Sequence, residues 1–319
     1  MVKYVSLTDL EVRALEVLYE RIINFYTEEI LIDSFLQESF IWATELPFEL
    51  KKAVYRFKLG EESNCLVIQN LPVNFTDNIR TPSNYESKSE KCFFTKDEIF
   101  LVLVSSLLGE VFTWDSIQEG NIINNIMPIK EHAAKIQSSG YENFFDLHTE
   151  DAFHPLSGEY LGLLCLRNPT HTATVVSSVN QEDLPEQVIN KLFEPCFIIG
   201  NNLAHAVSEI THFSSILFGD KNAPYIRLNL NNIKCKDRQA ADALEYLRRV
   251  LVQNIEKIIL QKGEILLIDN LTTVHGRDQY EPRFDGFDRW LKRVYITDQL
   301  KSSRAFRKNQ YSRIIQTKN

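Results

Sequence analysis

The residues best suited to chemistry lie in the segment FFDLHTEDAFHP, which contains His148 and Glu150. Of the seven histidines in the sequence, only His148 is followed by an acidic residue two positions later. Residues i and i+2 of an extended strand point to the same face, so this spacing can present an imidazole and a carboxylate to one metal ion. The same triplet also fits a histidine satisfied by ordinary core or surface contacts, so it needs support from elsewhere in the sequence.

His275 is the candidate for a third ligand. The run GEILLIDN, residues 263–270, has the composition of a buried strand, and LTTVHGR follows it directly. Two histidines and one carboxylate that leave three coordination positions open form the facial arrangement of non-heme Fe(II) oxygenases. The open positions are needed because a bidentate co-substrate occupies two of them and dioxygen takes the third.

Two arginines in the later segment DRWLKR, Arg289 and Arg293, could bind carboxylates. A guanidinium binds a carboxylate through two charge-assisted hydrogen bonds, an arrangement that lysine cannot reproduce. Arg289 could therefore hold the far carboxylate of 2-oxoglutarate, and Arg293, which has the same strand parity, could hold a second carboxylate. Without the HTE and HGR segments, DRWLKR would be interpreted as a charged strand end.

Helical and β-prone segments must position these residues. Residues 9–28 have apolar side chains near a 3.6-residue period. Residues 96–114 contain a second candidate helix, which would stop near Gly109 or shortly after. The polar stretch 76–91 has the composition of a surface loop. Two further helical segments, 181–193 and 237–260, interrupt a series of short β-prone runs punctuated by Pro, Gly, Asn and Asp. These runs are residues 159–167, 172–179, 196–200, 225–230, 264–269 and 292–297. The pattern predicts an α+β protein built on a β-sandwich or jelly roll.

The composition excludes several classes of protein. The 319 residues include 35 basic and 43 acidic side chains, giving a net charge of −8, so there is no basic surface for nucleic acid. Five widely spaced cysteines form no disulfide framework, which is typical of the cytoplasm. The N-terminus lacks the apolar core of a signal peptide, and the most apolar window, 99–112, is too short to span a bilayer. We therefore expect a cytoplasmic protein with neither a nucleic-acid nor a membrane partner, of undetermined oligomeric state.

The motifs HTEDAFH, IDNxxxxHGR and RWLxR, in that order, resemble the clavaminate synthase-like branch of the Fe(II)/2-oxoglutarate-dependent oxygenases. The similarity runs from about residue 107 to residue 296 and is nearest to hydroxylases of free arginine, asparagine and lysine. It implies a double-stranded β-helix core, jelly-roll or cupin-like, with flanking helices in one domain spanning residues 1–319. Residues 1–115 would be a mainly helical N-terminal layer, and residues 116–319 the core, with a helical insert at about 237–260.

The resemblance also implies which residues bind the metal and the co-substrate. The iron ligands would be His148, Glu150 and His275. Arg289 would anchor 2-oxoglutarate together with Thr174, although Thr172 is close enough to compete for that match. Related halogenases have a small residue in place of the carboxylate ligand, which opens a site for chloride. The acid is retained here, which favours hydroxylation.

At the substrate, the resemblance implies a set of residues around the amino-acid backbone. Arg293 would pair with the α-carboxylate, and Gln118 would touch the α-amino end. Ser138 and Ser139, in QSSG, match a loop that lines this pocket, and a free oxygen of Glu150 could accept a hydrogen bond from the α-ammonium group.

One segment departs from the family pattern. Residues 217–229 resemble the part that meets the substrate side chain, where several relatives have an aspartate at the position of Asn229. Asparagine cannot supply the charge that would pair with a guanidinium or ammonium group. Arg227, on the same strand face, would repel a cationic side chain. Neutral, amide or acidic side chains are therefore favoured, but other residues in or near a candidate lid keep lysine and arginine open: Asp220, Glu209, Glu194, Asn201 and Asn202.

The sequence thus predicts a dioxygenase that uses Fe(II), 2-oxoglutarate and O2. Its substrate would be a free L-α-amino acid, hydroxylated at the β or γ carbon with release of succinate and CO2. The first alternative is the same chemistry on a carrier-bound or peptidyl amino acid. The second is a non-enzymatic binding protein on a degenerate jelly roll, which would take up no iron. The third is a zinc hydrolase with the same triad, which would leave Arg289 without a purpose.

Overall fold

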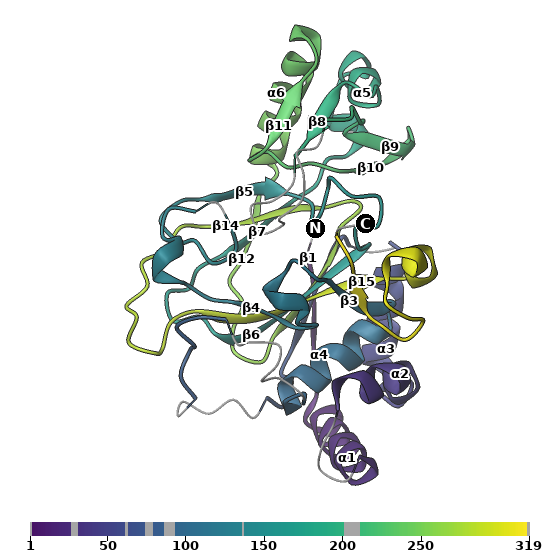
Figure 1. The fold of residues 1–319 in the computed structure, drawn as a ribbon, viewed down its shortest axis with the longest axis vertical. Helices are drawn as coiled ribbons and strands as arrows, with labels where there is room; N and C mark the ends of the chain where they lie inside the picture. Colours follow the sequence, from purple (N-terminus) through teal and green to yellow (C-terminus); the bar gives the residue numbers. More distant parts are fainter. Residues whose placement is uncertain are drawn as a thin grey trace.

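The structure, a computed structural model, shows two β-sheets, a layer of N-terminal helices and a smaller lobe (Figure 1). It describes residues 2–26, 31–60, 63–73, 79–85, 93–135, 137–200 and 211–317. Among the helices of these ranges, none has the length and apolarity needed to cross a bilayer.

The largest element is an eight-stranded sheet with the order β1-β2-β13-β6-β15-β3-β16, in which β4 also pairs with β15. Its strands are β1 (Val2–Ser6), β2 (Cys65–Gln69), β3 (Glu110–Trp114), β4 (Asn124–Ile126), β6 (Tyr160–Arg167), β13 (Ile265–Asp269), β15 (Trp290–Thr297) and β16 (Ile314–Ile315). β6 and β15 are buried along nearly their whole lengths, as expected for central strands covered on both faces.

A four-stranded sheet with the order β12-β7-β14-β5 faces part of the large sheet. Its strands are β5 (Phe145–His148), β7 (Thr174–Ser177), β12 (Glu256–Ile258) and β14 (Val274–Arg277). Val176 and Ile258 of this sheet share one buried apolar cluster with Leu161, Leu163 and Leu291 of the large sheet. The two sheets are therefore held face to face by an apolar layer.

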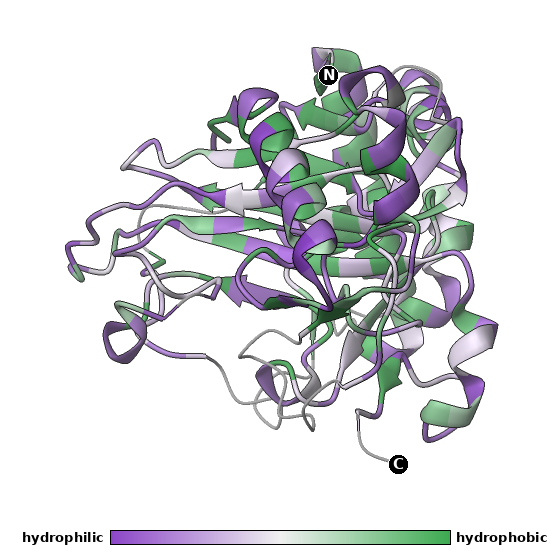
Figure 2. Ribbon diagram, turned by 90° about the horizontal axis from the view of Figure 1, so that it is seen from above, coloured by the Kyte–Doolittle hydropathy of each residue, from purple (hydrophilic) through white to green (hydrophobic). Residues whose placement is uncertain are grey.

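Four helices cover the other face of the large sheet. They are α1 (Asp9–Phe25), α2 (Ile32–Ala43), α3 (Phe48–Lys58) and α4 (Lys96–Ser106). Capping boxes at Thr8 and Thr95 satisfy backbone donors at the starts of α1 and α4. Their apolar faces pack against large-sheet residues such as Leu164 and Val294. Figure 2 shows both hydrophilic and hydrophobic residues along the helices of the molecule. The described part of residues 1–115 thus contributes four α-helices to this face, whereas β1, β2 and β3 of the same region belong to the large sheet.

The second candidate helix, within residues 96–114, stops close to the expected position near Gly109, but the strand that follows it was not predicted. α4 ends at Ser106, and residues Glu110–Trp114 form β3, which pairs with β15. Gly109 lies between them where the backbone approaches the sheet, and a Cβ atom there would be 2.4 Å from the carbonyl oxygen of Thr297. Residues Glu110–Trp114 are a strand because they pair with the sheet, and this pairing is not visible in the local periodicity of the sequence.

The remaining elements form a small lobe at the edge of the four-stranded sheet, at the top of Figure 1. They are α5 (Glu186–Leu192), α6 (Arg238–Gln253), and the two-stranded pairs β8 (Phe197–Ile199) with β11 (Ile233–Cys235) and β9 (Leu217–Asp220) with β10 (Ala223–Ile226). A buried apolar cluster holds them together. The predicted helical insert at about 237–260 is wrong at its end, because α6 stops at Gln253 and residues Glu256–Ile258 pair with β7.

Candidate active site

The three predicted metal ligands meet where β5 pairs with β14. His275 on β14 lies directly opposite His148 on β5, and their ring centroids are 4.5 Å apart. Glu150 lies two residues beyond the end of β5, with its Oε1 3.5 Å from Nε2 of His275. The three side chains are buried, and one ligand atom of each lies within 4.8 Å of the others. Residues far apart in the sequence thus form one cluster of metal-ligand type.

The protonation of this cluster suits a divalent cation. His148 Nδ1 donates a hydrogen bond of 2.9 Å to the carbonyl oxygen of Asp146, so Nε2 keeps the lone pair that a metal requires. Burial, together with His275, lowers the pKa of His148 to about 4, so its imidazole is neutral at pH 7. Burial alone would raise the pKa of Glu150, but Arg293 and the histidines hold it well below its usual range. A neutral imidazole and an ionised carboxylate are the forms that bind metal.

Arg289 lines the same cavity as Glu150 and His275 of the metal-ligand cluster. Its side chain is 3% exposed, and its Nε and Nη1 have no hydrogen-bond partner among the residues that the structure describes. A buried guanidinium without a partner is costly, so this geometry fits a site for an anionic ligand. Of the two candidate threonines, Thr174 lines the cavity, whereas the Thr172 hydroxyl is 2.6 Å from that of Thr170. Arg289 and Thr174 together therefore fit a carboxylate.

Arg293 joins the metal cluster to the remainder of the cavity. Its Nη1 donates a hydrogen bond of 2.8 Å to Oε1 of Glu150, and its Nη2 is 3.3 Å from Oδ1 of Asn124. Its Nε is buried without a partner among the described residues. The guanidinium is thus fixed on one side and has an unused donor for a second anion.

Of Gln118 and the two serines of the QSSG loop, Gln118 and Ser139 are not among the described residues that line this cavity. The Gln118 side chain donates to the carbonyl oxygen of Asn125 and accepts from its N–H, both at 2.9 Å, which fixes β4 beside Arg293. Ser138 lines the cavity, and the buried Ser139 hydroxyl is 2.7 Å from Nδ1 of His132. The Gln118 amide is therefore engaged with backbone in this structure.

Asn229 and Arg227 approach the site from the small lobe. Asn229 forms an isolated antiparallel bridge with His148, and its amide makes backbone hydrogen bonds of 3.0 and 3.2 Å. The Arg227 guanidinium stacks over Phe218, 4.1 Å from the ring centroid, and its Nε is buried without a described partner. Neither residue lines the cavity at the metal cluster.

The other residues considered for the side-chain end lie on the surface or outside the described ranges. Asp220 and Glu194 are exposed, and Glu194 pairs with Lys191 at 2.9 Å. The residues outside the described ranges are Asn201, Asn202 and Glu209.

Tyr85 contacts the site but was not among the predicted site residues. It lies in the stretch 76–91, and its hydroxyl interacts with the side chains of Ser139 and Ser138 and with the guanidinium of Arg293. Thr81 of the same stretch is buried and Tyr85 is partly buried, so the prediction of a surface loop is wrong at these two residues. An aromatic residue in an otherwise polar stretch was the available signal.

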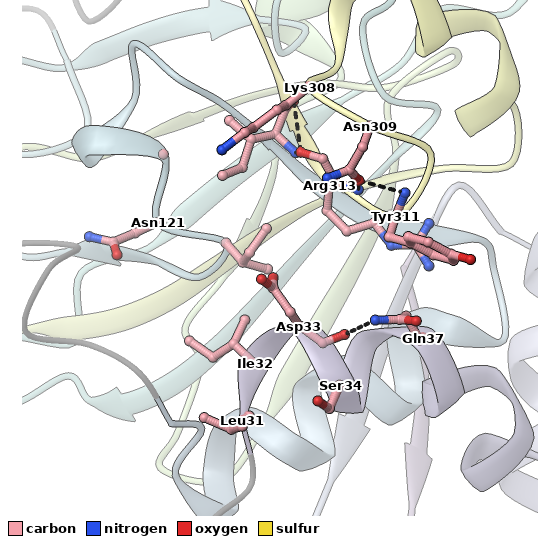
Figure 3. Close-up of a pocket in the computed structure, with 14 residues that line it drawn as sticks. Leu31, Ile32, Asp33, Ser34, Gln37, Asn121, Lys308, Asn309, Tyr311 and Arg313 are labelled. Atoms are coloured by element: carbon pink, nitrogen blue, oxygen red, sulfur yellow. Dashed lines mark hydrogen bonds between the residues drawn. The ribbon is translucent and has the colours of Figure 1, made fainter.

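A larger cavity, shown in Figure 3, is separate from this site. It has a volume of about 550 Å³ and lies between the start of α2 and residues 308–314. Its lining carries charges of both signs, including Asp33, Lys308 and Arg313, and Arg313 is already paired with Glu110 at 2.7 Å. It contains none of the predicted site residues, so the chemistry is assigned to the metal cluster.

Comparisons with known proteins agree with this geometry. The sequence profile of the "Taurine catabolism dioxygenase TauD, TfdA family" matches residues 214–295. L-ornithine/L-arginine 3-hydroxylase of Catenulispora acidiphila is 32% identical over 86% of this chain and 88% of that protein. Clavaminate synthase 2 of Streptomyces clavuligerus is 28% identical over 83% of this chain and 84% of that protein.

A solved structure agrees over almost the full length. The non-heme iron oxygenase OrfP in complex with Fe, succinate and (3S)-hydroxy-L-Arg is similar with a TM-score of 0.90 and 29% identity, covering 98% of this chain and 99% of that one. The resemblance seen in the motifs is thus confirmed. The protein belongs to the clavaminate synthase-like branch of the TauD/TfdA dioxygenases, and it is a non-heme iron enzyme of the amino-acid hydroxylase type.

Proposed function

We propose that the enzyme hydroxylates a free L-α-amino acid at a C–H bond of its β or γ carbon. It would use Fe(II), 2-oxoglutarate and O2 and release succinate and CO2. The observation that carries this proposal is the meeting of a buried His-Glu-His cluster with two arginines that have unused donors, Arg289 and Arg293. One arginine suits the far carboxylate of 2-oxoglutarate, and the other suits the α-carboxylate of an amino acid.

We assign His148, Glu150 and His275 to the iron and Arg289 with Thr174 to 2-oxoglutarate. Iron and 2-oxoglutarate, when bound, would supply the chemistry that activates O2, which is the oxidant. The protein's part is to orient them and to exclude water, which the apolar lining of the cavity supports: Ile126, Leu161, Leu163 and Leu291.

We assign the backbone end of the substrate to Arg293 and its neighbours. The unused Nε of Arg293 would meet the α-carboxylate, and the carboxylate of Glu150 would accept from the α-ammonium group. Ser139 and Gln118 would complete this end, Gln118 by fixing β4 beside Arg293. Holding both backbone groups would determine which carbon faces the iron.

We propose that the substrate side chain is neutral, amide-bearing or acidic. Asn229 brings no negative charge to the segment beside His148, and Arg227 has no ion pair with any described residue. Lysine and arginine stay open as substrates.

We also infer that the two facing sheets form a double-stranded β-helix and that residues 1–319 are one domain. Within it, residues 1–115 would form the N-terminal layer and residues 116–319 the core. The apolar cluster shared by the sheets supports this inference. The cysteines of the described ranges are free, which agrees with the prediction of a cytoplasmic protein.

The test is succinate production by Fe(II)-loaded protein with 2-oxoglutarate, exposed to air with each of the twenty L-amino acids. We expect one amino acid to stimulate turnover selectively, and R293A to abolish binding of that free amino acid. If no free amino acid raises succinate above the uncoupled background, the free-substrate proposal is wrong. A tethered amino acid that is still turned over by R293A would favour the carrier-bound alternative.

A further inference from the structure

Tyr280 presents a buried hydroxyl that the function described so far does not use. The residue is 8% exposed, and its Oη has no hydrogen-bond partner among the described residues. Its backbone N–H donates to the carbonyl oxygen of Tyr141 at 3.0 Å, so the residue is fixed in place. A buried hydroxyl without a partner is destabilising, which makes it a candidate for contact with a ligand.

Two buried guanidinium groups lie next to the Tyr280 ring. Cζ of Arg277 is 5.1 Å and Cζ of Arg289 is 6.0 Å from the ring centroid. Arg277 Nη1 donates to the carbonyl oxygen of Asp278 at 2.7 Å, and its Nε has no described partner. Both arginines line the cavity at the metal cluster. Within the described ranges, neither guanidinium forms an ion pair with a carboxylate, although Asp278 acts on Arg277 from a greater distance.

The number of donors matches one carboxylate. An ionised carboxylate offers about four acceptor positions. The Arg289 guanidinium, whose Nε and Nη1 have no described partner, can fill two of them through one pair of adjacent N–H groups, and the Thr174 hydroxyl can fill a third. The Tyr280 hydroxyl is a neutral donor for the remaining position.

We propose that the Tyr280 hydroxyl donates a hydrogen bond to the far carboxylate of 2-oxoglutarate and is a third anchor beside Arg289 and Thr174. Arg277 adds positive charge behind this site without contacting the carboxylate. The inference rests on the proposed function, since it assigns a residue to the co-substrate named there.

The test is Y280F, which removes the hydroxyl and leaves the ring. Binding of 2-oxoglutarate to the Fe(II)-loaded protein is measured by calorimetry without oxygen. We expect the Kd to rise about tenfold or more, the size of effect typical of a hydrogen bond to a charged group. Binding of 2-oxobutyrate, which lacks the far carboxylate, should be equal in Y280F and the wild type.

Two controls separate anchoring from a role in packing. Y141F makes the same change in the ring next to Tyr280, 6.2 Å away between centroids, and should leave the Kd unchanged. Without 2-oxoglutarate, the thermal midpoint of Y280F should equal or exceed that of the wild type, because a buried unpartnered hydroxyl has been removed.

Three results would overturn the inference. The first is a Kd for 2-oxoglutarate in Y280F within about twofold of the wild type, since a lost charged hydrogen bond should cost more. The second is equal weakening of 2-oxoglutarate and 2-oxobutyrate. The third is a thermal midpoint of Y280F below that of the wild type, which would show that the weaker binding results from lost stability. If Fe(II)-loaded wild type does not bind 2-oxoglutarate at all, the proposed function fails, and the Tyr280 assignment fails with it.

Discussion

Glu150 has two neighbours of opposite chemical role. Its Oε1 lies 3.5 Å from Nε2 of His275 and 2.8 Å from Nη1 of Arg293. The same carboxylate that is assigned to the iron therefore also neutralises the arginine assigned to the substrate. Metal binding and substrate binding are thus linked through one side chain.

E150Q should weaken iron binding and also leave Arg293 without its counterion. We expect it to abolish tight Fe(II) binding and to lower the free energy of unfolding by about 3 kcal/mol or more, because Arg293 would be left as a buried charge without its counterion. Urea unfolding of the metal-free protein, together with an Fe(II) titration, checks both effects. The double variant E150Q/R293M is the control, and it should recover much of the lost stability. Equal stability of E150Q and the wild type would show that the ion pair is absent in solution.

His148 should make the stability of the metal-free protein depend on pH. Its folded-state pKa of about 4 lies below the value of 6.5 for an unperturbed histidine. Between these values the unfolded state takes up a proton that the folded state does not, so stability falls as the pH drops. The loss from this group amounts to about 3 kcal/mol by pH 4.

Unfolding of the metal-free wild type and of H148N between pH 7 and pH 4 tests this expectation. The slope of unfolding free energy against pH should be smaller in H148N. Identical slopes would mean that His148 titrates normally and is not buried as a neutral ring.

At the scale of elements, Gly276 determines how closely β5 and β14 approach. It lies between His275 and Arg277, where the pairing register with β5 shifts. A Cβ atom there would be 2.3 Å from the carbonyl oxygen of Phe145 and 3.1 Å from Cγ2 of Val175. The position of one ligand relative to the other therefore depends on the absence of a side chain.

G276A should separate the two strands and with them His148 and His275. We expect Fe(II) affinity to fall by about tenfold or more and stability by more than about 2 kcal/mol. G60A is the control: its φ of +69° costs some stability, but no atom lies within 4 Å of the added methyl group and the site is not involved. Loss of stability with unchanged Fe(II) affinity in G276A would contradict the expectation.

The sequence predicted which side chains cluster better than it predicted the elements around them. His275 was found because it follows a buried strand, and His148 lies on β5, but Glu150 lies beyond the end of β5, so strand geometry alone does not account for its position. β12 was assigned to a helix and β3 was not recognised as a strand, since their pairing partners lie far away in the sequence and leave no local periodicity. Tyr85 and Tyr280 could not be assigned, because their positions depend on which loops meet Arg293 and Arg289.

At the scale of the whole molecule, a buried ion pair ties the helical layer to the strand that carries the substrate arginine. Nζ of Lys292 on β15 lies 3.0 Å from Oε1 of Glu98 on α4, and both side chains are buried. Adjacent residues of a strand face opposite sides, so Lys292 contacts the helices while Arg293 faces the cavity. The helical layer therefore supports the site, and among the described residues the three of metal-ligand type come from β5, β14 and the segment after β5.

K292M should destabilise the protein by about 3 kcal/mol, because Glu98 loses its cation inside the core. K292M/E98Q should be less destabilised than K292M, and Fe(II) binding should survive in both variants. Chemical unfolding and an Fe(II) titration provide the readouts. An Fe(II) affinity that falls in parallel with stability would show that the helices also position the ligands.

β15 also fixes the distance between the two arginines assigned to the co-substrate and the substrate. Arg289 directly precedes the strand and Arg293 lies within it, so their Cα atoms are at most about 13 Å apart along a rigid backbone. If these arginines bind 2-oxoglutarate and the amino acid, as proposed, the strand sets the distance between the two bound carboxylates. β15 would then determine which carbon of the substrate is hydroxylated. Changes in the small lobe could alter which substrate side chain is accepted without altering which carbon reacts.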